Sequence, residues 1–355
     1  MKKVAVLLSG GVDSSVALAT LVEQGYDVEA FYLKIWLEDE LSFLGDCPWQ
    51  EDVSYAESVC KQFNVPLHII PLQKEYHERI VSYTIDEVKA GRTPSPDVLC
   101  NRRIKFGVFF DHITDEYEKV ASGHYARVEY NDTTSLYELH TAPDPVKDQT
   151  YFLSHLTQQQ LSRIIFPIGH MQKHEVRQKA EQYNLLTKDR KDSQGICFLG
   201  KISFRDFVKH YLGTRTGNII EFETNAVVGT HDGFWFYTVG QRKGLGLSGG
   251  PWYVVGKNVT DNSVYVSRQY HDEGKERNSF SIDAMHWISG SPSNRTELAI
   301  KVRHGVHYNA GTLTYHADGG VSVVLAQRDQ GLAPGQFAVF YDGTCCLGSG
   351  VISKS

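Results

Sequence analysis

Several features that would narrow the class of this protein are missing from its sequence. No run of about 18 apolar residues occurs, so we expect no membrane span and no membrane partner. Met1-Lys2-Lys3 leads into only five apolar residues before a glycine pair, which does not resemble a signal peptide. The six cysteines include no Cys-x-x-Cys pair, so we expect cytosolic thiols, a cytoplasmic protein and no metal-ligand motif.

A large excess of charge of one sign is also missing. The chain has 36 basic and 42 acidic residues and a net charge of −6, which argues against a general nucleic-acid coat but permits a local basic face for RNA. Its 355 residues predict two or three domains, and a hydrophobic content of 41% permits a sizeable core.

The first chemical signal lies at residues 4–15. The apolar run Val4–Leu8 predicts a buried strand, Ser9-Gly10-Gly11 predicts a tight turn, and the residues from Val12 onward predict a helix, with Asp13 and Ser14 where its cap would be. A helix N-terminus after a glycine turn directs backbone N–H groups at one point and favours an anion. An ordinary strand-to-helix turn would also account for these residues.

This segment resembles the Ser-Gly-Gly-x-Asp-Ser-Ser loop of the ATP pyrophosphatase, or PP-loop, enzymes, and it has no lysine inside the turn as a Walker A loop would. The resemblance implies that the loop grips the pyrophosphate of ATP, with Mg²⁺, and that the enzyme adenylates an oxygen. The residues expected to bind ATP here are Leu8, Ser9, Gly10, Gly11, Val12, Asp13, Ser14 and Ser15.

Strand and helix patterns alternate through the first half of the chain. Residues 26–33 and 67–70 predict strands, the second of them short and buried, and residues 151–186 predict two helices broken at 166–169. The alternation predicts an α/β domain with a doubly wound parallel sheet. Ligands of such sheets lie beyond the carboxyl ends of the strands, where the loop at 9–15 is expected.

A cysteine loop follows at residues 91–101. Its two prolines predict a stiff, extended loop, after which Cys100 is expected to open a helix whose dipole favours the thiolate. Asp97 lies three residues earlier and is a candidate for proton transfer. A buried cysteine and a helix-capping aspartate would explain the same residues.

The loop resembles the Thr-Pro-Asn-Pro-Asp-x-x-Cys-Asn loop of the tRNA-specific 2-thiouridylases, which put sulfur on uridine 34 of certain tRNAs, although Ser95 replaces the usual asparagine. Lys191-Asp192-Ser193-Gln194-Gly195-Ile196-Cys197-Phe198 resembles the second cysteine loop of that family. The resemblance covers essentially the whole chain. It implies that Leu33 and Gly123 flank the adenosine. It also implies tRNA contacts at Ser95, Pro96, Asp97, His124, Lys147, Asp148, Gln149, Arg303, His304 and Gln336.

The pattern changes near residue 210, where short alternating segments recur about every ten residues. Strands are expected at 218–222, 234–239, 253–259, 263–267, 280–288, 297–302, 311–316, 321–326, 336–341 and 346–352. We therefore expect a catalytic domain at 1–208, a small central β domain at 209–275 and a tRNA-contacting C-terminal β-barrel at 276–355. A hairpin insertion is expected at 126–140.

Basic residues gather in this β half. Lys301 and Arg303 would share one strand face, either solvated or in contact with RNA, and His304 would stack on a partner. Lys257 belongs to the same basic group, whereas Cys345 and Cys346 are expected to be core thiols.

The resemblance implies a mechanism in which ATP adenylates O2 of the uracil and sulfur displaces AMP. Cys197 would carry the sulfur as a persulfide supplied by a sulfur-relay protein or a cysteine desulfurase, and Cys100 would release it by forming a Cys100–Cys197 disulfide. Asp97 would be the general acid or base.

Three alternatives remain at this stage. One is a PP-loop ligase of the amidotransferase type, which adenylates a small carbonyl substrate and would not need Cys100 and Cys197. Another is a non-catalytic RNA-binding protein with a relic ATP loop. The third is an iron–sulfur cluster on Cys100, Cys197 and Asp97, which the spacing does not distinguish from the persulfide route.

Overall fold

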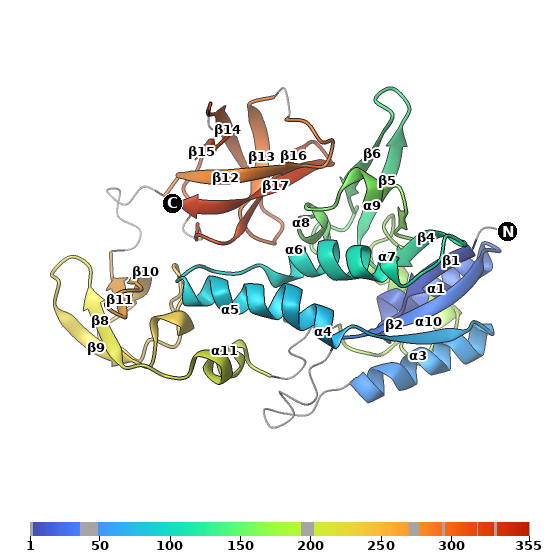
Figure 1. Cartoon of the computed structure of the whole chain (residues 1–355), viewed down its shortest axis with the longest axis horizontal. Helices are drawn as coiled ribbons and strands as arrows, with labels where there is room; N and C mark the ends of the chain where they lie inside the picture. The colour runs from blue at the N-terminus through green and yellow to red at the C-terminus, as the bar shows by residue number, and fades with distance from the viewer. Residues whose placement is uncertain are drawn as a thin grey trace.

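A computed structural model of the chain describes residues 3–35, 49–192, 202–269, 277–292, 295–317, 319–329 and 332–354. These residues form a parallel sheet with its helices, then a small four-stranded sheet, then a β-barrel (Figure 1). Within the described ranges, no helix is long and apolar enough to cross a membrane.

The first part is built on a five-stranded parallel sheet. Its strands, in the spatial order β3-β2-β1-β4-β7, are β1 (Lys3–Leu7), β2 (Asp27–Lys34), β3 (Leu67–Pro71), β4 (Tyr117–Ser122) and β7 (Ile164–Ile165). Alternate residues of β1 face opposite sides, so Ala5 and Leu7 enter one core and Val4 and Val6 another. The predicted doubly wound α/β domain is confirmed.

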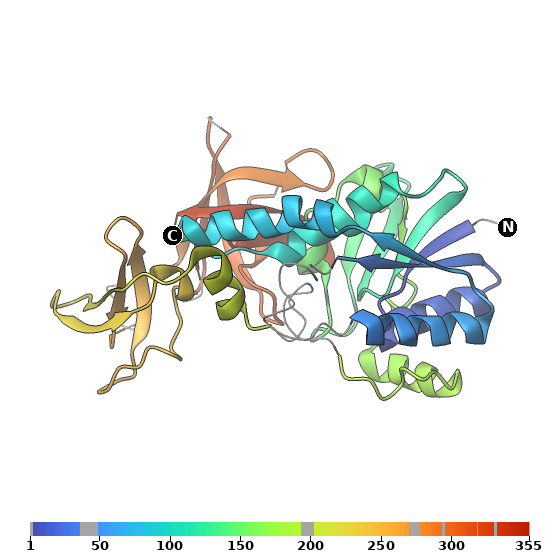
Figure 2. The same ribbon diagram turned by 60° about the horizontal axis from the view of Figure 1, so that its bottom comes forward.

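Helices cover both faces of this sheet (Figure 2). One face carries α1 (Val12–Glu23), α3 (Trp49–Phe63) and α10 (Lys173–Gln182). The other carries α4 (Gln73–Tyr76), η2 (His77–Val81), α5 (Ser82–Lys89), α6 (Pro96–Cys100), η3 (Asn101–Val108) and α7 (Phe109–Asp111).

Two local predictions in this part are wrong. Strand β3 is not buried, because it is the edge strand with a single neighbour, and Ile69 is 44% exposed. Residues 151–186 do not form two helices, since α8 (Thr150–Leu153) and α9 (Gln158–Leu161) are separate single turns and β7 precedes α10. Thr157 caps the start of α9, and its side chain accepts a hydrogen bond from the backbone N–H of Gln160.

The central part contains α11 (Phe204–Leu212) and a four-stranded sheet. In the order β10-β11-β8-β9 its strands are β8 (Gly217–Glu221), β9 (Val227–His231), β10 (Tyr253–Asn258) and β11 (Ser263–Ser267). The strand expected at 234–239 is instead the 3-10 turn η4 (Phe234–Phe236), which follows Gly233 with φ of +146°. Helix α11 runs across the expected boundary between residues 208 and 209.

The last part is a closed six-stranded barrel. Its strands are β12 (Ser279–Trp287), β13 (Glu297–Lys301), β14 (Asn309–Tyr315), β15 (Val321–Leu325), β16 (Phe337–Asp342) and β17 (Cys345–Lys354). Pairing of β12 with β17 closes the barrel. The fold class expected from the sequence, an α/β domain followed by two β domains, is therefore confirmed.

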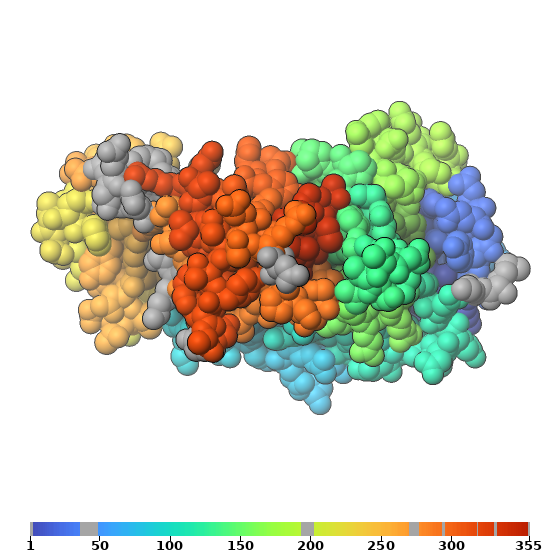
Figure 3. All heavy atoms as spheres, turned by 90° about the horizontal axis from the view of Figure 1, so that it is seen from above, coloured from blue at the N-terminus to red at the C-terminus, as the bar shows by residue number. Residues whose placement is uncertain are grey.

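The hairpin of β5 (Ala126–Asn131) and β6 (Leu136–Thr141) lies where predicted, but it also joins the barrel. Strand β6 pairs with β17 through Cys345 and Cys346. Figure 3 shows the end of the chain, in red, against the green hairpin. The hairpin of the first part and the strands of the barrel thus form one continuous sheet, separate from the parallel sheet.

Candidate active site at the carboxyl edge of the parallel sheet

The loop at residues 9–15 connects β1 to α1 in a tight turn. Gly10 has φ of +74°, and a Cβ there would lie 2.3 Å from the backbone oxygen of Asp52, so only glycine fits. The hydroxyls of Ser14 and Ser15 donate to the carbonyl of Gly11 at 3.1 and 2.8 Å. Ser14 Oγ also accepts from the backbone N–H of Ser9 at 3.2 Å.

The start of α1 differs from the sequence expectation. The residue at the cap position is Gly11, which makes no side-chain cap bond, and Asp13 and Ser14 lie inside the first turn. The backbone N–H groups of Val12, Asp13 and Ser14 therefore have no partner within the helix. They supply the positive end of the helix dipole to the space above the loop.

This loop lies where the strand order reverses. Strands β2 and β4 flank β1, so the chain leaves the sheet in opposite directions on either side of the loop. Gly123 follows β4 directly, and a Cβ on it would lie 2.6 Å from the backbone nitrogen of Ser14. Leu33, near the end of β2, is half-buried. The residues expected at the ATP site are therefore gathered along one edge.

A network of charged side chains surrounds Asp13. Its carboxylate accepts from Tyr125 Oη and from Lys173 Nζ, each at 2.7 Å. Lys173 also lies 2.8 Å from Asp192, which pairs with Lys147 at 2.6 Å. Burial favours a raised pKa for Asp192, but the hydrogen bonds from Lys147 and Lys173 outweigh it and lower the pKa to about 2.

Arg190 links the same region to the turn. Its guanidinium donates to the carbonyl of Gly10 at 2.7 Å, pairs with Asp52 of α3 and lies over the ring of Tyr55 at 4.5 Å. Sequence reasoning gave no role to Lys173 or Arg190, and it named Asp192 only as part of the second cysteine loop. The charged run at 188–192 was the available signal, but it could equally have been a solvated segment.

The second cysteine loop falls largely outside the described residues. Cys197 belongs to the segment 193–201. This segment follows Asp192, which lies beside the loop of residues 9–15, and it precedes the buried Ile202.

Cys100 does not open a helix as expected. Helix α6 begins at Pro96, with Ser95 at the cap position, and Cys100 is its fifth residue. The dipole effect weakens beyond the first turn, so it favours the thiolate less than the sequence indicated. Cys100 is 1% exposed and packs in the same core as Leu7, and Asp97 lies in the first turn of α6.

His124 is packed between aromatic rings. Its Nδ1 lies 2.7 Å from Ser122 Oγ, and its ring centroid is 6.1 Å from Phe106 and 5.7 Å from Phe166. Burial, aided by the charge of Lys105, holds the pKa of His124 well below its usual range. The imidazole is therefore neutral at physiological pH and can shape the site without adding charge.

The segment 147–151 joins this edge to the barrel. Gln149 accepts from the backbone N–H of Tyr125 at 2.9 Å and returns a bond through its own N–H. Asp148 is buried, and its carboxylate lies 3.1 Å from Lys301 Nζ. Tyr151 Oη donates to the carbonyl of Phe337 at 3.0 Å.

Lys301, the last residue of β13, and Arg303, two residues beyond it, do not share a solvated face. Lys301 is buried against Asp148, with its side chain 1% exposed, because the hairpin and segment 147–151 cover this end of the barrel. Arg303 is 55% exposed and pairs with Asp329 at 2.8 Å. His304 stacks on Phe152 with ring centroids 4.6 Å apart, and its Nε2 lies 3.1 Å from the carbonyl oxygen of Asp148. Its expected stacking on RNA stays a prediction.

The turn before Gln336 packs against the cysteine loop. Thr93 N–H donates to the carbonyl of Pro334 at 2.8 Å, and a Cβ on Gly335 would lie 2.8 Å from Thr93 O. The segments expected to contact tRNA near Ser95, Asp148, His304 and Gln336 thus come from distant parts of the chain and meet between the first part and the barrel. Lys257 does not join them, since it is bonded to the carbonyl of Tyr237 and burial lowers its pKa to about 8.

Comparison with known proteins agrees with this geometry. Residues 2–201 match a family model described as the tRNA methyl transferase HUP domain, residues 205–268 its PRC-barrel domain, and residues 277–352 an aminomethyltransferase beta-barrel domain. The chain is 44% identical to tRNA-specific 2-thiouridylase MnmA 1 of Bacteroides thetaiotaomicron over 357 residues, and 44% identical to tRNA-specific 2-thiouridylase MnmA of Porphyromonas gingivalis over 361 residues. Each match covers 99% of both chains.

Among solved structures, the U34-tRNA thiolase NcsA from Methanococcus maripaludis matches 59% of this chain and 63% of its own. The sequence identity is 19% and the TM-score 0.34, so this match carries no argument about function.

Proposed function

Because the chain belongs to the family of tRNA-specific 2-thiouridylases, we propose that it replaces O2 of the wobble uridine of tRNA with sulfur at the expense of ATP. The observation that carries this proposal is the loop of residues 9–15, which presents the α1 N-terminus at the reversal point of a parallel sheet and adjoins the segment that leads to Cys197.

The loop fits the phosphates of ATP. Glycine at positions 10 and 123 lets the turn pack against Asp52 and lets the end of β4 pack against Ser14, and three backbone N–H groups of α1 are available to phosphate oxygens. Residues 8–15 would hold the pyrophosphate part, Leu33 and Gly123 would flank the adenosine, and Mg²⁺ would accompany the phosphates. Lys173 would keep the Asp13 carboxylate from repelling the nucleotide.

The chemistry begins with an activated oxygen. O2 of the uracil attacks the α-phosphorus of ATP, pyrophosphate leaves, and AMP becomes the leaving group at C2. A persulfide on Cys197 then attacks C2 with its terminal sulfur. Cys100 attacks the inner sulfur of Cys197, the sulfur–sulfur bond breaks, its electron pair stays on the transferred sulfur, and AMP departs with the C2–O2 bonding pair.

Asp97 would move the proton in this sequence, and Cys100 and Cys197 would end as a disulfide that a thiol reductant reopens. Chain length limits the distance of Cys197 from the ATP loop, because Cys197 follows Asp192 by five residues, a span of at most about 18 Å. Asp192 itself is bonded to Lys173, beside Asp13.

The tRNA would bind between the first part and the barrel. Its contacts would come from Ser95, Pro96, Asp97, His124, Lys147, Gln149, Arg303, His304 and Gln336, whose segments meet there. Asp148 is buried against Lys301, so it would act by positioning Gln149 and His304. An exposed anticodon base suits such a site, since RNA-specific proteins read unstacked loop bases.

The domain boundaries remain proposals as well: a catalytic domain at 1–208, a central β domain at 209–275 and a barrel at 276–355. A sulfur-relay protein or a cysteine desulfurase would supply the sulfur. An iron–sulfur cluster on Cys100, Cys197 and Asp97 is the competing chemistry, and an iron assay on anaerobically purified protein distinguishes the two.

The decisive experiment is a sulfur-transfer assay on an unmodified anticodon stem-loop with ATP, cysteine and a cysteine desulfurase, which supplies Cys197 with persulfide sulfur, and with a thiol reductant that reopens the disulfide. We expect 2-thiouridine and AMP from the intact protein, and no thiolation from Cys100→Ser or Cys197→Ser. Cys60→Ser is the matched control, because Cys60 is a buried thiol of α3 whose pKa is raised to about 12 by burial. Adenylation of a small molecule without sulfur entering RNA would contradict the proposal and favour the ligase.

A further inference from the structure

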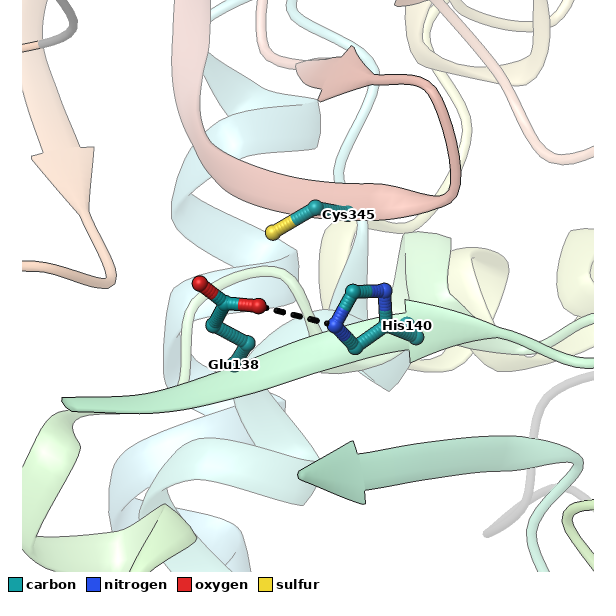
Figure 4. Close-up of side chains that lie close together, drawn as sticks. All are labelled: Glu138, His140 and Cys345. Carbon is teal, nitrogen blue, oxygen red and sulfur yellow. Dashed lines mark hydrogen bonds and ion pairs between the residues drawn. The ribbon is translucent and has the colours of Figure 1, made fainter. Parts of the chain in front are cut away.

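Three side chains with metal-binding atoms lie together where the hairpin joins the barrel (Figure 4). His140 of β6 and Cys345 of β17 are directly paired across the sheet, so their side chains project from the same face. Glu138 precedes His140 by two residues on β6 and shares that face. In Figure 4 all three side chains point into one space between the two strands.

The spacing of the donor atoms suits a small ion. His140 Nε2 lies 3.0 Å from a carboxylate oxygen of Glu138. One donor atom from each of Glu138, His140 and Cys345 lies within 4.8 Å of the other two. Ligands bonded to tetrahedral Zn²⁺ at about 2.0–2.3 Å are about 3.3–3.8 Å apart. Small side-chain rotations would therefore bring the three atoms onto one ion.

The imidazole is already oriented for this role. His140 Nδ1 lies 3.0 Å from Thr344 Oγ1, which leaves Nε2 turned toward Glu138. Metal-binding histidines are commonly fixed in this way through their other ring nitrogen. The side chains of His140 and Glu138 are 13% and 31% exposed, so the group is partly buried but open to a water ligand.

The surroundings favour a cation. Glu129 of β5 lies opposite Glu138 in the hairpin register, and one of its carboxylate oxygens lies 4.0 Å from His140 Nε2. The carboxylates of Glu138, Asp342 and Glu129 lie near the Cys345 thiol and make this end of the hairpin negative. Arg127 offsets part of this negative charge by pairing with Glu129 at 2.7 Å.

We propose that Glu138, His140 and Cys345 bind a divalent transition-metal ion of the zinc type, which fastens the hairpin of the first part to the barrel. Thiolate and imidazole ligands select such an ion over Mg²⁺ or Ca²⁺. On binding, the thiol proton passes to solvent and a metal–sulfur bond replaces the S–H bond. Within the ranges that the structure describes, no other group of three such ligands lies this close together.

The test uses Co²⁺ as a spectroscopic probe in the full chain. A Cys100→Ser/Cys197→Ser background removes the two cysteines that the proposed sulfur chemistry uses, so that the result does not depend on that proposal. We expect one Co²⁺ per chain with a thiolate-to-cobalt charge-transfer band that Zn²⁺ displaces. Cys345→Ser should abolish the band, Cys60→Ser should leave it unchanged, and Thr344→Val should weaken affinity about 10–100-fold.

Circular dichroism would show whether Cys345→Ser is folded, and His140→Gln provides a second variant with the same readout. Absence of the band from the background protein, or its survival in folded Cys345→Ser, would overturn the proposal. A rise in melting temperature with Zn²⁺ in the background but not in Cys345→Ser would support the fastening role.

Discussion

Lys173 Nζ lies 2.7 Å from Asp13 Oδ1, although the two residues are 160 positions apart in the chain. This contact attaches the start of α10 to the first turn of α1. It also offsets the negative charge of Asp13, which would otherwise repel bound phosphates. The same ammonium lies 2.8 Å from Asp192, so one side chain links the turn to the approach of the second cysteine loop.

Replacing Lys173 with Met should raise KM for ATP about 10–100-fold, because it removes charge-assisted hydrogen bonds and leaves two carboxylates near the phosphates. Steady-state kinetics of AMP release would measure the change. Lys179→Met is the control, since Lys179 lies on the same helix but pairs with Glu23 at 3.4 Å, away from Asp13. An unchanged KM in Lys173→Met would contradict the role given to this lysine.

Gly123→Ala should weaken ATP binding more than tenfold and lower the melting temperature. Its Cβ would lie 2.6 Å from the backbone nitrogen of Ser14, so the loop must shift, and such overpacking costs about 1–3 kcal/mol. Gly256→Ala is the matched control, because a Cβ on Gly256 would lie 3.9 Å from the Tyr265 side chain, an ordinary van der Waals contact. Calorimetric titration with ATP compares the two, and equal affinities would show that Gly123 does not set the loop position.

The sequence was informative wherever local chemistry decides structure. The apolar run of β1 and the glycines after it predicted the strand and the turn, because each depends only on neighbours in the chain. The expected start of α1 was wrong in detail, since Gly10 and Gly11 form the turn and leave Asp13 to a long-range partner.

Long-range contacts explain the other differences. Lys301 has the sequence context of a solvated strand residue, and only the arrival of Asp148 from another part of the chain buries it. The edge position of β3 depends in the same way on strand order rather than on its own residues. The cluster at Cys345 was equally hidden, because its two strands are about 200 residues apart in the sequence.

Lys301→Met should destabilise the protein by about 3–5 kcal/mol, since it leaves the Asp148 carboxylate buried without its cation. Arg303→Met is the matched comparison, two residues beyond the end of β13. Its pair with Asp329 is exposed, so it should cost at most about 1 kcal/mol. Urea unfolding measures both.

Adding Asp148→Leu to Lys301→Met should restore part of the stability, because the unpaired charge is then gone. A double variant as unstable as the sum of the two single variants would show that the pair is not coupled.

Asp192 should make stability depend on pH in the acid range. Its folded pKa of about 2 lies below the ordinary 3.8, so the unfolded chain takes up the proton first as the pH falls. The stabilisation is fully present above about pH 4 and is lost as the pH falls toward 2. Its size is on the order of 1 kcal/mol, because the side chain is partly solvated and screened.

Unfolding of the intact protein and of Asp192→Asn at pH 2 to 6 would test this, with the exposed Asp189→Asn as control. The difference in unfolding free energy between the intact protein and Asp192→Asn should shrink as the pH falls through this window. Protonation of Asp192 in the intact protein removes the same negative charge that the substitution removes. A difference that stays constant down to pH 2 would mean that Lys147 and Lys173 do not stabilise the ionised carboxylate, and that the link between the ATP loop and the second cysteine loop is not electrostatic.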